Sequence, residues 1–204
     1  MTESKEKKQF DWIEEYPHQY IFDETPQILK TTKNVCICIS GIWHTDITKE
    51  FTDAIQALSW IAFALKFKMK RKNPDGYYDY TMPPAESFRT NIDKPKEERN
   101  RKAVLRQPDF IWADDVLKMR RIAHAKSKDT KLPQIDFETL NSQKVIQIGH
   151  FGPYTEMNDT IAKIHKFAKE KKLTLVWPHH EIYLNDLRRT KPAELKTIVR
   201  YVVK

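Results

Sequence analysis

The feature that most constrains the fold of this sequence is an order of elements that occurs twice. "KNVCICISGIW" alternates apolar and small residues and stops at a glycine, which predicts a strand over about 35–40. From Asp46, a candidate N-cap, apolar residues recur at helical spacing as far as "KRKNPDG". "YYDYTMP" and "AESFRT" then read as two further strands. The predicted order is strand, helix, strand, strand.

The same order is predicted again in the last third of the chain. "KVIQIGHFGPY" reads as a strand and "TEMNDTIAKIHKFAKEKKL" as an amphipathic helix, while "HHEIYLND" and "KTIVRYVV" supply the closing strands. Between the halves, "ADDVLKMRRIAHAKS" has the acidic start and basic end of an inserted helix. Two such units predict one α+β domain, in which the helices cover one face of the sheet and leave the other face open.

The predicted domain spans residues 31–204, with repeats at about 33–92 and 143–203. Residues 1–30 lack a clear period and are interpreted as an N-terminal extension. The extension carries four aromatic side chains that could anchor it, Trp12, Tyr16, Tyr20 and Phe22. Whether these rings cap a cleft or pack behind the sheet is left open by the sequence.

Composition excludes several classes of protein. A hydrophobic content of 40% is sufficient for a buried core, and no window approaches the roughly 18 uninterrupted apolar residues of a membrane span. The first residues are too charged for a signal peptide, so we expect a cytoplasmic protein with no membrane partner. The basic residues fall mainly in 66–72, 94–102 and 118–131, where Phe67 is the one aromatic residue, so these segments do not interleave aromatic rings for base stacking. These segments are interpreted as solvated loops and helix ends, with no specific nucleic-acid binding.

Cysteine and histidine do not indicate a metal site. Cys36 and Cys38 point the same way from one strand and are interpreted as reduced core residues, with a two-ligand metal corner as the alternative. His179 and His180 precede the last strand pair, but no further ligand at metal spacing completes a site with them. We expect neither a metal nor another cofactor.

One carboxylate stands within an otherwise apolar predicted strand. In "HHEIYLNDLRR", strand alternation directs Ile182 and Leu184 to one face and Glu181, Tyr183 and Asn185 to the other. We expect Ile182 and Leu184 to face the helix layer, so that the acid enters the open face. A cleft lined by aromatic residues with a carboxylate at its base is typical of a small-molecule site.

These segments resemble a known family. "IGHFGPYTEMNDTIAKIHKF" and "HHEIYLNDLRRTKPAELKTIVR" resemble the GyrI-like small-molecule-binding family, and the likeness extends over roughly residues 30 to 203 to its stand-alone cytoplasmic branch. The resemblance implies two strand-helix-strand-strand repeats related by a pseudo-twofold axis, with a ligand cleft between them. It also implies aromatic, often cationic ligands anchored by Glu181, with Tyr154 at the cleft mouth and Tyr183 beside the acid. Further candidate ligand-binding residues are Trp43, Trp60, Tyr78, Tyr80, Trp112 and His150.

The stand-alone branch includes hydrolases that open cyclopropanoid electrophiles. The resemblance therefore makes Glu181 and Glu86 candidate catalytic acids, and desolvation would raise the pKa of such a carboxylate. This chain departs from the branch after Glu86, where Ser87 to Thr90 replace a glycine and a tryptophan pair. Phe88 is a candidate substitute for one lost ring, and Arg89 adds a charge that could pair with either acid.

Three functions remain open at this stage. The first is a cytoplasmic protein that binds aromatic or cationic small molecules for sequestration, sensing or detoxification, including a multidrug-binding role. The second is a hydrolase of cyclopropanoid electrophiles with Glu181 as acid or base. The third is an interaction partner of another protein, such as a gyrase modulator.

Overall fold

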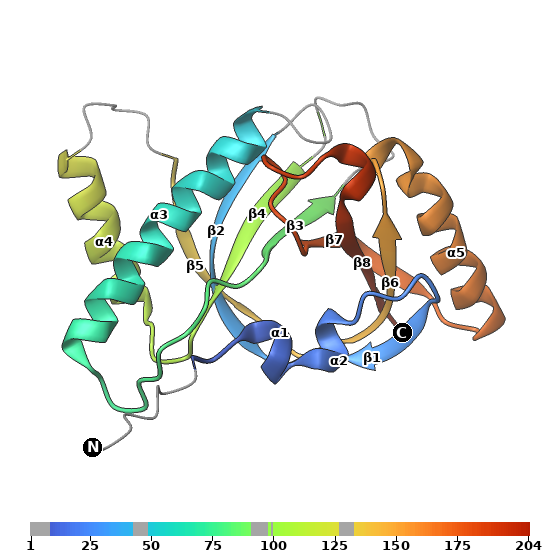
Figure 1. The fold of residues 1–204 in the computed structure, drawn as a ribbon. Helices are drawn as coiled ribbons and strands as arrows, with labels where there is room; N and C mark the ends of the chain where they lie inside the picture. The colour runs from blue at the N-terminus through green and yellow to red at the C-terminus, as the bar shows by residue number, and fades with distance from the viewer. Residues whose placement is uncertain (1–8, 43–48, 91–97, 99, 127–132) are drawn as a thin grey trace, which may run out of the picture.

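The computed structural model describes residues 9–42, 49–90, 98, 100–126 and 133–204. The described residues form one eight-stranded antiparallel sheet with helices against it, so the predicted α+β class is confirmed. Figure 1 shows the long helix α3 (Lys49–Lys72) and helix α4 (Ala113–Lys126) at one end and helix α5 (Met157–Glu170) at the other. Helix α4 is the inserted helix that the sequence predicted between the two halves.

Two units of the expected order build the middle of the sheet. The first unit is β2 (Asn34–Ile42), α3, β3 (Ala85–Thr90) and β4 (Asn100–Gln107). The second is β6 (Lys144–Phe151), α5, β7 (Leu175–Tyr183) and β8 (Lys196–Val203). The strand order is β6-β8-β7-β3-β4-β2. From either end of this order the first, then the third, then the second strand of a unit follow one another. A pseudo-twofold axis therefore passes between β3 and β7, and β1 (Gln27–Lys30) and β5 (Asp136–Leu140) extend the two edges.

Both long helices pack on the same face of the sheet. The buried stripe of α3, which includes Phe51, Leu58 and Leu65, packs with Ile37 of β2 and Leu105 of β4. Helix α5 buries Met157, Ile164 and Ala168 against β6 and β8. We call this surface of the sheet the helix face and the other surface the opposite face. Each helix ends where the sequence favours termination, because α3 finishes in a basic turn followed by Asn73 with a φ of +45°.

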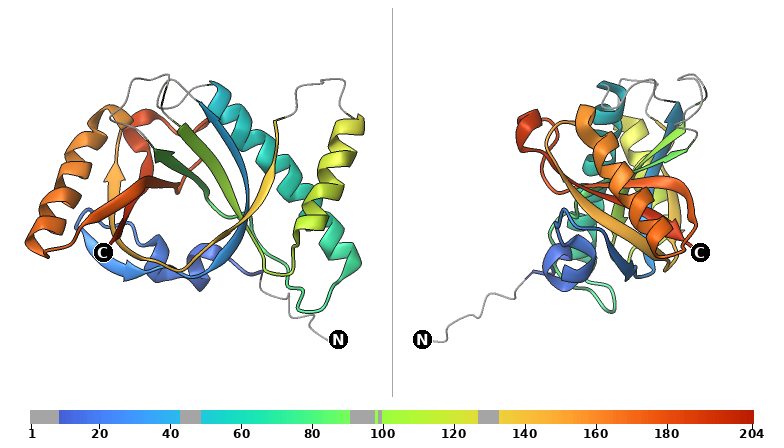
Figure 2. Two further views of the ribbon diagram at one scale, coloured as in Figure 1. Left: turned by 180° about the vertical axis from the view of Figure 1, so that it is seen from behind. Right: turned by 90° about the vertical axis from the view of Figure 1, so that its right-hand side faces the viewer.

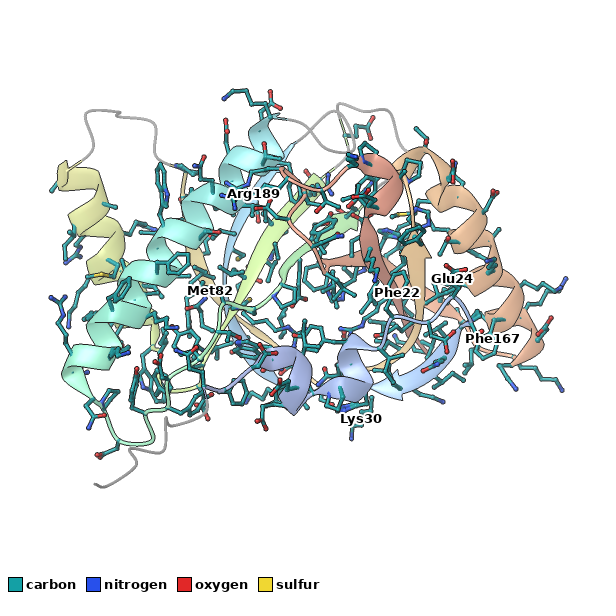
Figure 3. The ribbon with its side chains drawn as sticks, viewed as in Figure 1. Phe22, Glu24, Lys30, Met82, Phe167 and Arg189 are labelled. Atoms are coloured by element: carbon teal, nitrogen blue, oxygen red, sulfur yellow. The ribbon has the colours of Figure 1, made fainter. Side chains whose placement is uncertain are left out.

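The N-terminal extension packs on the opposite face, which answers the question that the sequence left open. Its short helices α1 (Trp12–Glu15) and α2 (Pro17–Tyr20) bury Trp12 and Tyr20 against Ile182 and Ile198. The chain then continues beside β6, where the amide of Gly149 donates to the carbonyl of Asp23 at 2.6 Å. A Cβ at Gly149 would lie 3.1 Å from this backbone and from the ring of Phe22, which is labelled in Figure 3. Close approach of the extension therefore requires glycine here.

Three predictions about strands were wrong. Residues 77–83 do not form a strand, because Tyr80 makes only an isolated bridge to Phe10 and its ring packs in the core beside Phe110. "AESFRT" is consequently the second strand of its unit, and the third is β4, which the sequence suggested to be part of a basic loop. Edge strands β1 and β5 were not predicted. Strand β4 was overlooked because its arginines are neutralised by carboxylates on other strands, which local sequence cannot reveal.

None of the helices in the described part of the chain is both long enough and apolar enough to cross a membrane.

Candidate functional site

Glu181 lies next to the pseudo-twofold axis, at the centre of the sheet. Its strand partner across the axis is Ser87 of β3, and its partner on the other side is Val199 of β8. Val199 packs under α5, so Glu181 faces the helix layer. The alternation along β7 was predicted correctly, but its direction was wrong: Ile182 points to the opposite face, where the N-terminal extension covers it.

The carboxylate of Glu181 is completely buried and is bound on both oxygens. Its Oε1 atom lies 2.5 Å from Nη2 of Arg89 and 2.8 Å from Nε2 of His179. Its Oε2 atom accepts from the hydroxyl of Tyr183 at 2.5 Å and lies 3.3 Å from Nη2 of Arg101. We call these five residues the Glu181 cluster. Two guanidinium groups face one carboxylate, so the acid is neutralised within the protein.

The charges in the cluster determine the protonation state of the acid. Burial by itself would raise the pKa of Glu181, but the charges of Arg89 and Arg101 and the hydrogen bond from His179 outweigh it. The pKa of Glu181 is therefore held well below its ordinary value, opposite to the direction expected for a carboxylate in an apolar cleft. Burial raises the pKa of Tyr183, which keeps its hydroxyl protonated as a donor. The cluster thus has a fixed pattern of donors and acceptors at neutral pH.

Aromatic rings from both units surround the cluster. Phe51 of α3 lies 3.7 Å from the Arg101 guanidinium carbon and 5.8 Å from the Tyr183 ring. Tyr154, which begins the short helix η2 (Tyr154–Glu156) before α5, lies 6.2 Å from Tyr183 on the other side. Tyr154 is thus adjacent to the cluster, and its hydroxyl lies 3.2 Å from Thr197 Oγ1. A cation-π contact holds the Arg101 side chain in place.

A cavity of about 380 Å³ reaches the cluster through Tyr183. Ile55 and Ser59 of α3 line one side of it, and Trp12 of the N-terminal extension lines another. Met82, labelled in Figure 3, lies between these elements and packs against the core under α3. Apolar residues make up just over half of the lining; the rest includes hydroxyl groups, Asn185 and the charged residues Asp11, Asp186 and Arg188, of which the last two pair with each other. An uncharged ligand with one polar group can pack on the apolar part.

The second candidate acid, Glu86, lies on the opposite face. It is completely buried, its carboxylate is paired with Nε of Arg106, and it accepts from Nε2 of His180 at 2.7 Å. Burial would raise the pKa of Glu86, but Arg106 and His180 lower it well below its ordinary value. Glu86 and Glu181 therefore cannot act together on one substrate, because the sheet separates them.

Five other candidate residues lie away from the Glu181 cluster. Phe88 is on the opposite face, stacked on His180 at 4.1 Å, so it does not replace a ring in the same cleft. His150 binds Thr160 and the Pro153 carbonyl and positions the start of α5. Tyr80 is a core residue, whereas Trp60 and Trp112 are 64% and 68% exposed.

The last two candidate aromatic residues and the two cysteines also lie away from the Glu181 cluster or outside the described residues. Tyr78 packs on Phe10 and Phe110, and Trp43 lies outside the described residues. Cys36 and Cys38 are free and buried in a small apolar cluster with Val104, as predicted. Among the residues that the structure describes, no group of three or more His, Cys, Asp or Glu is arranged to hold a metal ion.

Part of the chain matches a known protein family. Residues 109–202 match the model of the GyrI-like small molecule binding domain, a segment that contains Glu181, Tyr183 and Tyr154. No curated protein sequence matches the chain.

Solved structures share the fold over nearly the whole chain. A hydrolase from Listeria innocua is 26% identical with a TM-score of 0.82, and the match covers 96% of this chain and all of that one. An uncharacterized conserved protein from Listeria innocua, also 26% identical, has a TM-score of 0.84 over the same coverage. The C-terminal domain of EcmrR shares the fold at 11% identity, with a TM-score of 0.55 over 88% of this chain and 97% of that one. By sequence, residues 109–202 are similar to the GyrI-like small molecule binding domain, and over nearly its whole length the chain shares the fold of the Listeria proteins.

Proposed function

We propose that this protein binds uncharged small molecules with an aromatic or aliphatic body on the helix face, beside the Glu181 cluster. The observation that carries this proposal is the internal neutralisation of Glu181 by Arg89 and Arg101. The family match supports small-molecule binding in general. The charge balance around the acid supports a narrower class of ligand than the cations that the resemblance implied.

The argument against a cationic ligand is electrostatic. A cation drawn to Glu181 would approach two guanidinium groups as well, and buried charges interact strongly because screening there is weak. It would also have to displace Arg89, whose side chain is 16% exposed, from a 2.5 Å contact. An uncharged ligand can instead pack on the rings of Tyr154 and Tyr183 and hydrogen-bond to the cluster.

Ligand-induced thermal shift tests the proposal with a well-matched control. Neutral aromatic compounds and aromatic cations of similar size are added to the wild type, to Glu181→Gln and to Glu86→Gln. The two variants each remove a completely buried carboxylate that is paired with an arginine and a histidine, but from different faces. We expect neutral compounds to stabilise the wild type and Glu86→Gln, with a smaller shift in Glu181→Gln. Stabilisation by cations alone would contradict the proposal.

A second candidate function is hydrolysis. It is favoured by the row of hydrogen bonds from Tyr201 through His179 to Glu181, at 2.7 and 2.8 Å, which fixes the carboxylate in one orientation. The similar Listeria protein described as a hydrolase supports it as well. In this function Glu181 would orient a water molecule toward a strained cyclopropane carbon. The new carbon–oxygen bond would replace a ring carbon–carbon bond, and the water proton would pass to the carbon or carbonyl that receives the electrons.

Turnover distinguishes the two functions. If the protein is a hydrolase, a cyclopropanoid compound incubated with the wild type will be consumed faster than with Glu181→Gln, with gain of one water in the product. If the compound binds and is recovered unchanged, the role is sequestration or sensing. The low pKa of Glu181 makes it a weak base, so we expect binding without turnover.

We propose no role for this protein in sequence-specific DNA recognition. Arg101, Arg106 and Arg200 are buried in the sheet and are not available to phosphate groups. A DNA mobility shift that depends on sequence and persists at high salt would contradict this assignment.

A further inference from the structure

A second and larger cavity lies on the opposite face of the sheet. Its volume is about 750 Å³, within the range of sites for drug-sized molecules. Strands from both units line it, with Arg106 of β4, His180 of β7 and Arg200 of β8 at its base. The N-terminal helices α1 and α2 lie over the neighbouring part of the same face (Figure 2), where they pack on Ile182, and none of their residues is among those that line the cavity.

The base of this cavity has an imbalance of charge. Two guanidinium groups, those of Arg106 and Arg200, are buried there, while Glu86 is the single buried carboxylate that faces them. Glu86 is bound by Arg106, and burial lowers the pKa of His180 to about 4, so the histidine is neutral at pH 7. One positive charge is therefore in excess among the described groups. The pair of Lys102 and Glu138 at the rim is balanced.

Arg200 carries the excess charge. It is 1% exposed, and its hydrogen bonds go to uncharged oxygens: Nε donates to Oε1 of Gln147 at 2.6 Å, and Nη2 donates to the carbonyl of Gln19. Its Nη1 atom has no hydrogen-bond partner in the described structure. Burial and the neighbouring Arg106 lower the pKa of Arg200 to about 10. A buried guanidinium without a counter-charge is unfavourable, and an anion in the adjoining cavity would offset that cost.

Part of the remaining wall of the cavity is apolar, and polar side chains such as Thr32, Thr139 and Gln143 line the rest. Phe88, stacked on His180, lies on one side, and Val145 and Val202, which pair across β6 and β8, lie on the other. Leu140 at the end of β5 extends the apolar wall. A ligand with one negative charge would balance the excess positive charge at the base, and a hydrophobic body would pack on the apolar part of the wall.

We propose that this cavity binds an organic monoanion, an aromatic or aliphatic carboxylate, with its acid group toward Arg200 and its body between Phe88 and Val202. This site lies on the other side of the sheet from Glu181, because Arg200 and Glu181 project from opposite faces, although Arg101 of the Glu181 cluster also contributes to its lining. It takes a ligand of different charge from the one proposed for the helix face. It therefore does not depend on that proposal.

The test compares 2-naphthoate with 2-naphthamide, which has nearly the same shape and no charge, by isothermal titration calorimetry on the full chain. We expect the carboxylate to bind the wild type at least about tenfold more tightly than the amide, because only the anion interacts with the unbalanced guanidinium. In Arg200→Met, which keeps the long apolar stem, this preference should disappear. Because 2-naphthamide is a neutral aromatic compound that the site beside Glu181 could also bind, the deciding comparison is naphthoate binding to the wild type and to Arg200→Met. Equal naphthoate affinity in the two proteins, or no naphthoate binding to the wild type, would overturn the proposal.

A second variant keeps the test decisive if Arg200→Met does not fold. Val202 is partly exposed at the cavity wall, so Val202→Asp adds a negative charge there without removing a buried group. We expect this variant to lose naphthoate binding by at least about tenfold and to retain more of its naphthamide binding. Trp112→Ala, at an exposed position that does not line this cavity, should bind naphthoate as the wild type does. Unchanged naphthoate binding in Val202→Asp, or its loss in Trp112→Ala, would place the anion elsewhere and refute the assignment.

Discussion

Replacement of Glu181 by Gln tests the energetic role of the cluster. The substitution keeps the size of the side chain but removes the charge that Arg89 and Arg101 share. Removal of one partner from a buried ion pair costs about 3 to 5 kcal/mol, because the remaining charge stays desolvated. Arg101 has a 3% exposed side chain, but it keeps its bonds to Tyr183 and Ser87 and its contact with Phe51. We therefore expect a loss near the lower limit, about 3 kcal/mol.

Urea unfolding followed by circular dichroism measures this loss directly. For a chain of this length, about 3 kcal/mol corresponds to a decrease of about 6 to 12 °C in the melting temperature. The matched control is Glu138→Gln, which breaks the partly exposed pair with Lys102 and should cost at most about 1 kcal/mol. If Glu181→Gln costs no more than Glu138→Gln, the cluster does not hold a desolvated charge and the electrostatic argument for an uncharged ligand fails.

Three further predictions concern acid stability, thiol reactivity and the N-terminal extension. Burial lowers the pKa of His180 to about 4, so as the pH falls the histidine of the unfolded chain is protonated before that of the folded chain. The free energy of unfolding should therefore fall by about 3 kcal/mol between pH 6.5 and 4. In urea titrations His180→Gln should show a smaller fall over this range, and an unchanged pH dependence would refute the prediction. Burial raises the pKa of Cys36 to about 12, and Cys38 shifts in the same direction, so neither thiol should react with Ellman's reagent at pH 8 until urea unfolds the protein. Trp12 is buried, so Trp12→Ala should lower the free energy of unfolding by about 3 to 5 kcal/mol. Trp112→Ala, at an exposed position, should change it by less than about 0.5 kcal/mol. Equal effects of the two substitutions would mean that the N-terminal extension does not pack as described.

The sequence alone was sufficient for the elements with a clear hydrophobic period. Helices α3, α4 and α5 and the strands β2, β6, β7 and β8 follow from apolar spacing and from their flanking polar residues. The order of those elements, with the family resemblance, predicted the repeat and the central place of Glu181. Alternation also placed Glu181 and Tyr183 correctly on one face.

Tertiary structure decided which face that was and what neutralises the acid. The face depends on where α3 and the N-terminal extension pack, and both sides of β7 bury apolar residues, so the local pattern is the same for either choice. Arg101 looked like part of a solvated basic loop, because charge in a sequence indicates exposure unless a partner is known, and nothing in the sequence indicated a partner for Arg106. Their partners are 80 and 20 residues away along the chain. Only the pairing of β3, β4 and β7 brings these arginines and their glutamate partners together. The pairing therefore determines the protonation state of Glu181. It also leaves Arg200 as the guanidinium without a counter-charge.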